Sequence, residues 1–131
     1  MDKPPTSVSA ARLLVLLNAI VWLAFSTIIA IGAHPAMPDS ALLRWVMAIL
    51  GLLTSAALLV LYAFLGRRSR LAFFAALVAL GCLAVLTLAD QVGCVDVAVL
   101  ALTLAPMACL IGGRGWFMQG RAGRPDPDRA A

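Results

Sequence analysis

The stretch Leu88-Ala-Asp-Gln-Val-Gly-Cys-Val-Asp96 separates two long apolar runs in the second half of the chain. It places the carboxylates of Asp90 and Asp96 and the amide of Gln91 between segments that carry almost no charge. Gly93 can adopt the positive φ that a tight turn requires. Because short connections make consecutive helices antiparallel neighbours, the stretch is predicted to be the turn of a helical hairpin.

The composition extends this interpretation to the whole chain. Of the 131 residues, 63% are hydrophobic and 12% are charged, and the mean hydropathy is +1.02. Soluble domains are about half apolar and about one quarter charged. A small soluble domain buries too little of its surface to hide this much apolar area, so the composition predicts an integral membrane protein.

Four apolar runs are long enough to cross a hydrocarbon layer of about 30 Å. The predicted spans are 13–31, 41–65, 71–89 and 95–113. A signal peptide is not expected at the first run, since the run is too long and further spans follow. The predicted fold is therefore all-α, a transmembrane up-down-up-down four-helix bundle formed by residues 13–113.

The two ends of the chain are polar. Residues 1–12 are predicted to be a disordered cytoplasmic head, and residues 114–131 an interfacial anchor followed by a disordered cytoplasmic tail. The anchor is Arg114-Gly-Trp-Phe-Met118, because arginine and aromatic side chains favour the headgroup region.

The basic residues set the predicted orientation. In a four-span arrangement nine of the ten lie on one side of the membrane, and only Arg44 lies on the other. Basic residues accumulate on the cytoplasmic side, so both termini are predicted to be cytoplasmic. The net charge of +4 therefore reflects membrane topology, and no nucleic-acid partner is expected.

Small residues predict which helix faces pack, because they let helix backbones approach in a membrane. Each span contains one such seam: Ala19, Ser26, Ala30 and Ala33; Ala48, Gly51 and Ser55; Ala72, Ala75, Ala76, Ala79 and Cys82; and Ala98, Ala101, Ala105, Ala108 and Gly112. The four seams favour a close-packed bundle.

Two charges can be placed against these seams. Arg44 precedes Ala48 by four residues, and Asp90 continues the face of the third seam, so the two are predicted to meet at the outer surface as a polar site that includes Gln91. The alternative is that Arg44 extends to the outer headgroups. Asp96 is predicted to cap the last helix and to complement its dipole.

Few other side chains offer chemistry. Asn18 is the one strong hydrogen-bonding side chain deep in the first span, and it is expected to bond to another helix. His34 is the only histidine, and the cysteines form no CxxC pair. No metal site, cofactor site or catalytic constellation is therefore predicted.

The segment Leu86–Asp96, followed by an apolar helix and Arg114-Gly-Trp-Phe117, resembles a pattern in small four-span bacterial membrane proteins. In that pattern an Asp, a Gly and a second Asp mark the turn before the last helix. The resemblance covers roughly the second half of the chain. It implies a four-helix fold in the bacterial inner membrane, and it implies no activity.

Two functions are compatible with these features. The first is a non-enzymatic accessory or structural subunit that packs against other membrane proteins, or against itself, within membrane lipids. Abundant small-residue faces and the missing catalytic groups favour it. The alternative is a small transporter or channel-like protein with an acidic outer vestibule formed by Asp90 and Asp96.

Overall fold

A computed structural model of the chain describes residues 4–33, 40–67, 69–89 and 94–118, and within these ranges every regular element is a helix. The helices are α1 (Thr6–Ile31), α2 (Ala41–Leu65), α3 (Arg70–Ala89), α4 (Cys94–Gly112) and α5 (Arg114–Met118). The predicted all-α class is confirmed for this part of the chain. Three helices, α1 to α3, are long and apolar enough to cross a membrane, as in a multi-pass membrane protein, and the apolar part of α4 is shorter.

Helix α1 begins at Thr6, inside the predicted head of residues 1–12 and before the predicted span start at 13. Pro5 stands at its N-terminus. Proline lacks a backbone N–H, but the N–H groups at a helix start have no intrahelical acceptor, so no helical hydrogen bond is lost. The Pro5 carbonyl accepts the backbone N–H of Val8 at 3.0 Å. Val8 and Ala11 are fully buried. Residues 6–12 thus form about two helical turns that contribute to the core.

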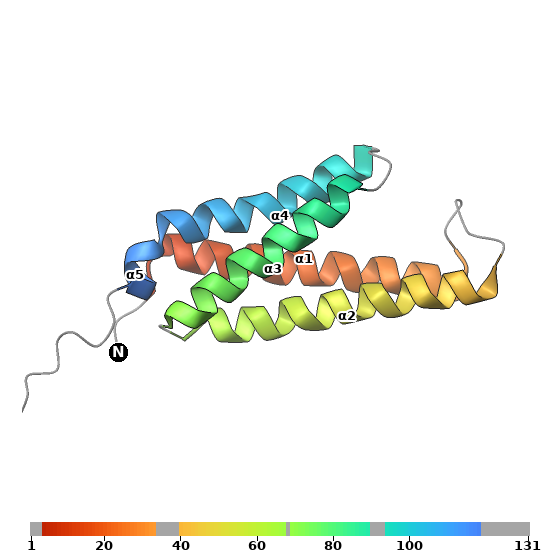
Figure 1. Cartoon of the computed structure of the whole chain (residues 1–131), viewed down its shortest axis with the longest axis horizontal. Coiled ribbons are helices and arrows are strands. Elements are labelled where there is room, and N and C mark those ends of the chain that lie inside the picture. Colours follow the sequence, from red (N-terminus) through yellow and green to blue (C-terminus); the bar gives the residue numbers. More distant parts are fainter. Residues whose placement is uncertain (1–3, 34–39, 68, 90–93, 119–131) are drawn as a thin grey trace, which may run out of the picture.

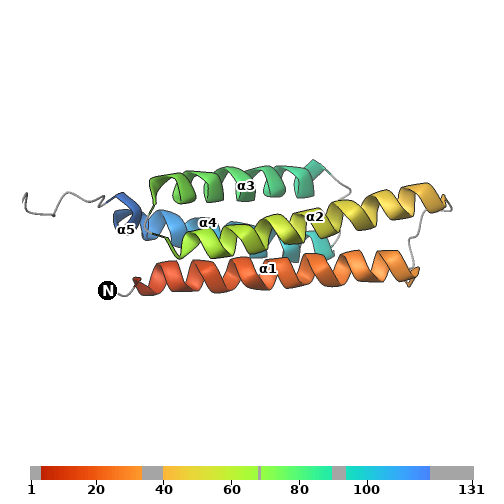
Figure 2. The same cartoon turned by 90° about the horizontal axis from the view of Figure 1, so that it is seen from below.

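Helices α1 and α2 form a tight antiparallel pair and lie side by side in both views (Figures 1 and 2). The Ser26 hydroxyl donates to the Ala48 carbonyl, and the Ser55 hydroxyl donates to the Ala19 carbonyl at 2.9 Å. At Gly51 an added Cβ would lie 3.2 Å from the Cβ of Ser26. The seams predicted for these two helices are therefore confirmed as the surfaces through which they pack, except at Ala33, which is exposed.

Helices α3 and α4 form a second pair that diverges from the first toward the right-hand end of Figure 1. Helix α4 packs on both α1 and α3, whereas α2 and α3 touch only sparingly. At the same end, the α1–α2 pair extends beyond the ends of α3 and α4 in both views. The two helical pairs therefore enclose an angle that widens toward this end.

The seam predicted for α4 is wrong as an internal packing surface. Ala98, Ala101, Ala108 and Gly112 are exposed and Ala105 is half-buried, whereas Thr103, Pro106 and Leu110 are buried. Small residues permit close approach but do not by themselves select which helix approaches. The side of α4 that turns inward is the one carrying Thr103, which bonds to α1, and the large side chain of Leu110.

The short helix α5 closes the opposite end of the molecule. Phe117 is 1% exposed, and its ring lies 5.4 Å from that of Phe73 between centroids. Arg70 of α3 donates to the Met118 carbonyl at 3.1 Å. The aromatic Phe117, which the sequence assigned to an interfacial anchor, therefore belongs to the core, because α5 folds back onto the start of α3.

Candidate functional site

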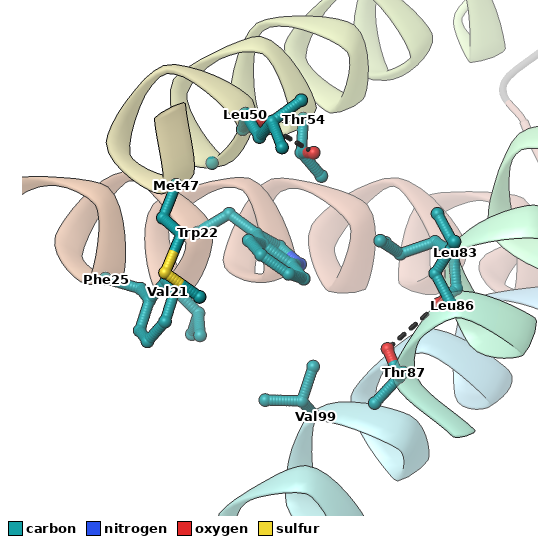
Figure 3. Close-up of a pocket in the computed structure, with 11 residues that line it drawn as sticks. Val21, Trp22, Phe25, Met47, Leu50, Thr54, Leu83, Leu86, Thr87 and Val99 are labelled. Atoms are coloured by element: carbon teal, nitrogen blue, oxygen red, sulfur yellow. Dashed lines mark hydrogen bonds between the residues drawn. The ribbon is translucent and has the colours of Figure 1, made fainter. Parts of the chain in front are cut away.

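A cavity of about 340 Å³ lies in the angle between the two helical pairs (Figure 3). Helices α1 to α4 all contribute to its wall. The lining residues are Val21, Trp22, Phe25, Met47, Leu50, Gly51, Thr54, Leu83, Leu86, Thr87 and Val99. The volume lies at the lower end of the range of about 300–1,000 Å³ for ligand pockets. It is roughly twice that of an apolar cavity of about 150 Å³ that holds benzene.

The wall of the cavity is uncharged, and its hydroxyl protons are already donated. The Thr54 hydroxyl donates to the Leu50 carbonyl at 2.9 Å, and the Thr87 hydroxyl donates to the Leu83 carbonyl at 2.9 Å. Trp22 packs edge-on against Phe25, with 5.9 Å between the ring centroids. The cavity therefore favours hydrocarbon over a charged or strongly polar solute.

A buried polar contact lies on α1 one helical turn from Trp22. Asn18 is fully buried, and its Nδ2 donates to the hydroxyl of Thr103 on α4 at 3.1 Å. Thr103 in turn donates to the Val99 carbonyl at 2.8 Å. The Oδ1 atom of Asn18 is shielded and has no hydrogen-bond partner among the described residues. The expected interhelical contact of Asn18 thus ties α1 to α4 near the wall of the cavity.

The predicted outer polar site falls largely outside the described residues. Arg44 is half-buried in the first turn of α2, and its Nε is shielded without a hydrogen-bond partner in the described part of the chain. Asp90 and Gln91 lie outside the described residues, so their approach to Arg44 stays a prediction. Asp96 lies in the first turn of α4, but its side chain is not described, and its role as a cap also stays a prediction.

No candidate metal site is found among the described residues. These contain no group of three or more His, Cys, Asp or Glu side chains that could hold a metal ion. His34 lies outside the described ranges. The predictions of no metal, no cofactor and no enzymatic activity therefore stay predictions.

The cavity itself was not predicted from the sequence. Its lining consists of apolar residues and threonines that occur throughout the spans, and only the divergence of two helical pairs brings them together. The one local signal was the concentration of the aromatic residues Trp22 and Phe25 in the second half of the first predicted span.

Comparison of the chain with protein-family models, with curated proteins and with solved structures finds no match.

Proposed function

We propose that this protein is a small non-enzymatic accessory or structural subunit of the bacterial inner membrane. It crosses the membrane as an up-down-up-down four-helix bundle with both termini in the cytoplasm. It packs against other membrane proteins or against a second copy of itself.

One observation carries the proposal: the small-residue face of α4 lies on the outside of the molecule. Ala98, Ala101, Ala108 and Gly112 are exposed, at spacings that align them along one side of the helix. Helices in membranes associate through such faces because backbones can approach closely there. The chain uses the equivalent faces of α1 and α2 internally, and it leaves the face of α4 available to a partner.

The distribution of cationic side chains supports the proposed orientation. Arg12 lies over the ring of Tyr62 at 4.7 Å from its centroid, and Arg67 lies over the ring of Phe64 at 4.9 Å. Both pairs lie at the end where α1 begins and α2 ends, together with Arg70. Arginines paired with aromatic rings fit the cytoplasmic interface of a membrane protein.

The alternative of a small transporter receives less support. An acidic outer vestibule would depend on Asp90 and Asp96, whose side chains are not described. The cavity that the described residues form is lined by uncharged side chains. A pathway for cations would need polar or charged groups facing it at membrane depth. We therefore place the packing function first.

The test is association of the full chain in native membranes. Ala101→Leu together with Ala108→Leu covers the outer face of α4 with larger side chains. The matched control is Ala56→Leu with Ala63→Leu, which changes two exposed alanines of α2 at the same spacing. Cross-linking in membranes, followed by mild detergent extraction and mass spectrometry, measures the partners of each variant.

The α4 variant is expected to lose its cross-linked partner, whether a second copy or another protein, while the α2 control retains it. A wild-type chain that stays monomeric and captures no protein in native membranes contradicts the subunit function. Loss of the partner in both variants would place the interface elsewhere than on α4.

A further inference from the structure

We propose that the cavity between the two helical pairs holds one acyl chain of a phospholipid, and that Arg44 binds the phosphate of that lipid. The binding site comprises Trp22, Met47, Thr54, Leu83 and Val99 for the chain and Arg44 for the headgroup. This inference is independent of the small-residue face of α4.

The wall of the cavity suits a hydrocarbon chain. The lining side chains are apolar except for the two threonines and the indole N–H of Trp22. Both hydroxyl protons are donated to carbonyls of their own helices, and the Trp22 Nε1 is shielded, with no hydrogen-bond partner among the described residues. Such a wall offers dispersion contacts to a hydrocarbon chain and little hydrogen bonding to a water-soluble ligand. Within a membrane the abundant molecule with this chemistry is the acyl chain of a lipid.

Arg44 lies in line with the cavity along α2. Arg44, Met47, Gly51 and Thr54 follow one another at spacings of three, four and three residues, so they lie along one side of α2. Three of them line the cavity, and Arg44 stands one turn beyond its end. A cationic group therefore stands at the headgroup end of an apolar cavity. Arginine recognises phosphate through its planar set of N–H donors.

The distance from Arg44 to the far end of the cavity matches the length of an acyl chain in one leaflet. Arg44 and Thr54 are ten residues apart on α2, or about 15 Å along the helix axis. One leaflet contributes about half of a hydrocarbon thickness of roughly 30 Å. A lipid whose phosphate contacts Arg44 would therefore place its chain alongside Met47 and Leu50 and end it near Thr54 and Trp22.

The arrangement of the helices explains how a chain could enter. Helix α2 makes few contacts with α3, and the α1–α2 pair projects beyond the ends of α3 and α4 (Figures 1 and 2). Figure 3 shows Trp22 and Met47 on one side of the cavity and Leu83 and Val99 on the other. A chain can lie in this angle without displacing the packing of α1 on α2.

The experiment uses Trp22 as the reporter in the full chain. In a Trp45→Phe, Trp116→Phe background, Trp22 is the remaining tryptophan. The protein is reconstituted into phosphatidylglycerol vesicles whose acyl chains are brominated near their middle, and quenching of Trp22 fluorescence is measured. Val99→Phe fills the cavity. The matched control, Val97→Phe, adds the same side chain at a position of α4 that is 55% exposed.

Strong quenching is expected in the background protein and in Val97→Phe, and most of it is expected to be lost in Val99→Phe. Thr54→Met fills the cavity from α2, and it should reduce quenching in the same way if Val99→Phe fails to fold. Equal quenching with the cavity open and filled would overturn the proposal. So would quenching of Trp22 by aqueous acrylamide instead of by the brominated chains, which would indicate a water-filled cavity.

The role of Arg44 is tested in the same vesicles. Arg44→Gln should weaken quenching by dilute brominated phosphatidylglycerol in a background of unbrominated lipid, whereas Asp90→Asn should not weaken it. If the Arg44→Gln variant is quenched as strongly as its parent, Arg44 does not bind the lipid phosphate. If Val99→Phe instead causes an oligomer of the protein to dissociate, the cavity is occupied by a side chain of a second copy and not by lipid.

Discussion

Asn18 of α1 and Thr103 of α4 join two helices that are 85 residues apart in the chain, through a buried hydrogen bond of 3.1 Å. Both side chains are fully shielded. In the described part of the molecule this is the one side chain to side chain hydrogen bond between the two helical pairs. The bond therefore specifies the rotation of α4 against α1. Apolar contacts cannot specify it in the same way, because lipid can replace them.

A double-mutant cycle tests this bond. Thr103→Val keeps the shape of the side chain but removes the acceptor for Asn18, and it is expected to destabilise the protein by about 0.6 to 1.7 kcal/mol, the range for such bonds in membranes. In an Asn18→Leu background the same change should have a much smaller effect. Unfolding in mixed micelles measures the free energies. Equal effects in both backgrounds would mean that the two side chains are not coupled.

The rotation of α4 also explains where prediction from the sequence succeeded and failed. Apolar run lengths identified the helical segments, and the small residues of α1 and α2 identified their contact, because both helices offer a seam at the same depth. On α4 the larger number of small residues pointed to the wrong side. In lipid, burying a small residue gives no hydrophobic gain, so the polar contact of Thr103 could decide the rotation.

The cavity could not be predicted from the sequence for a related reason. No pattern of residues along the chain predicts the angle between the α1–α2 pair and the α3–α4 pair. That angle depends on which side chains meet between α1 and α4. The sequence indicates that Asn18 needs a partner, but only the structure identifies this partner as Thr103. Likewise, the burial of Phe117 required α5 to fold back onto α3, which an aromatic residue near a membrane surface does not by itself imply.

The contact between α1 and α2 predicts opposite effects at two glycines. At Gly51 an added Cβ would lie 3.2 Å from the Ser26 Cβ, whereas at Gly81 it would meet nothing within 4 Å. Gly51→Leu is expected to force α1 and α2 apart and to destabilise the protein by about 1–3 kcal/mol, as overpacking does. Gly81→Leu should be neutral or stabilising, because leucine favours the helix by up to about 1 kcal/mol.

Unfolding free energies of the two glycine variants in the same detergent provide the measurement. Both substitutions add the same side chain inside a helix. A difference between their unfolding free energies is therefore attributed to the close contact of position 51 with Ser26. A stable Gly51→Leu protein with unchanged α1–α2 cross-linking would show that the helices tolerate a wider separation than the observed contact.

The end formed by α5 predicts a core role for Phe117. Phe117→Ala removes a ring that is 1% exposed and packs on Phe73, and a loss of about 3 kcal/mol or more is typical for such a truncation. Met118→Ala is the control, since Met118 is 37% exposed on the same short helix. The Phe117 variant should release α5, which limited proteolysis in micelles detects as faster cleavage near Arg114. Equal cleavage of both variants would mean that the ring does not hold α5 in place.

The pairing of Arg12 with Tyr62 predicts a graded response to substitution. The guanidinium carbon of Arg12 lies 4.7 Å from the centre of the ring, so the contact depends on the aromatic face and not on the hydroxyl. Tyr62→Phe should therefore leave stability close to that of the parent. Tyr62→Leu should destabilise the protein by about 0.5–1 kcal/mol, the usual magnitude of a cation–π contact at a partly exposed site.

The contribution of the charge is isolated by measuring the unfolding free energies of both variants again in an Arg12→Gln background. Without the guanidinium, leucine and phenylalanine at position 62 should differ in stability only through packing. A Tyr62→Leu penalty that persists unchanged without Arg12 would assign the effect to the half-buried ring itself and not to its contact with the charge.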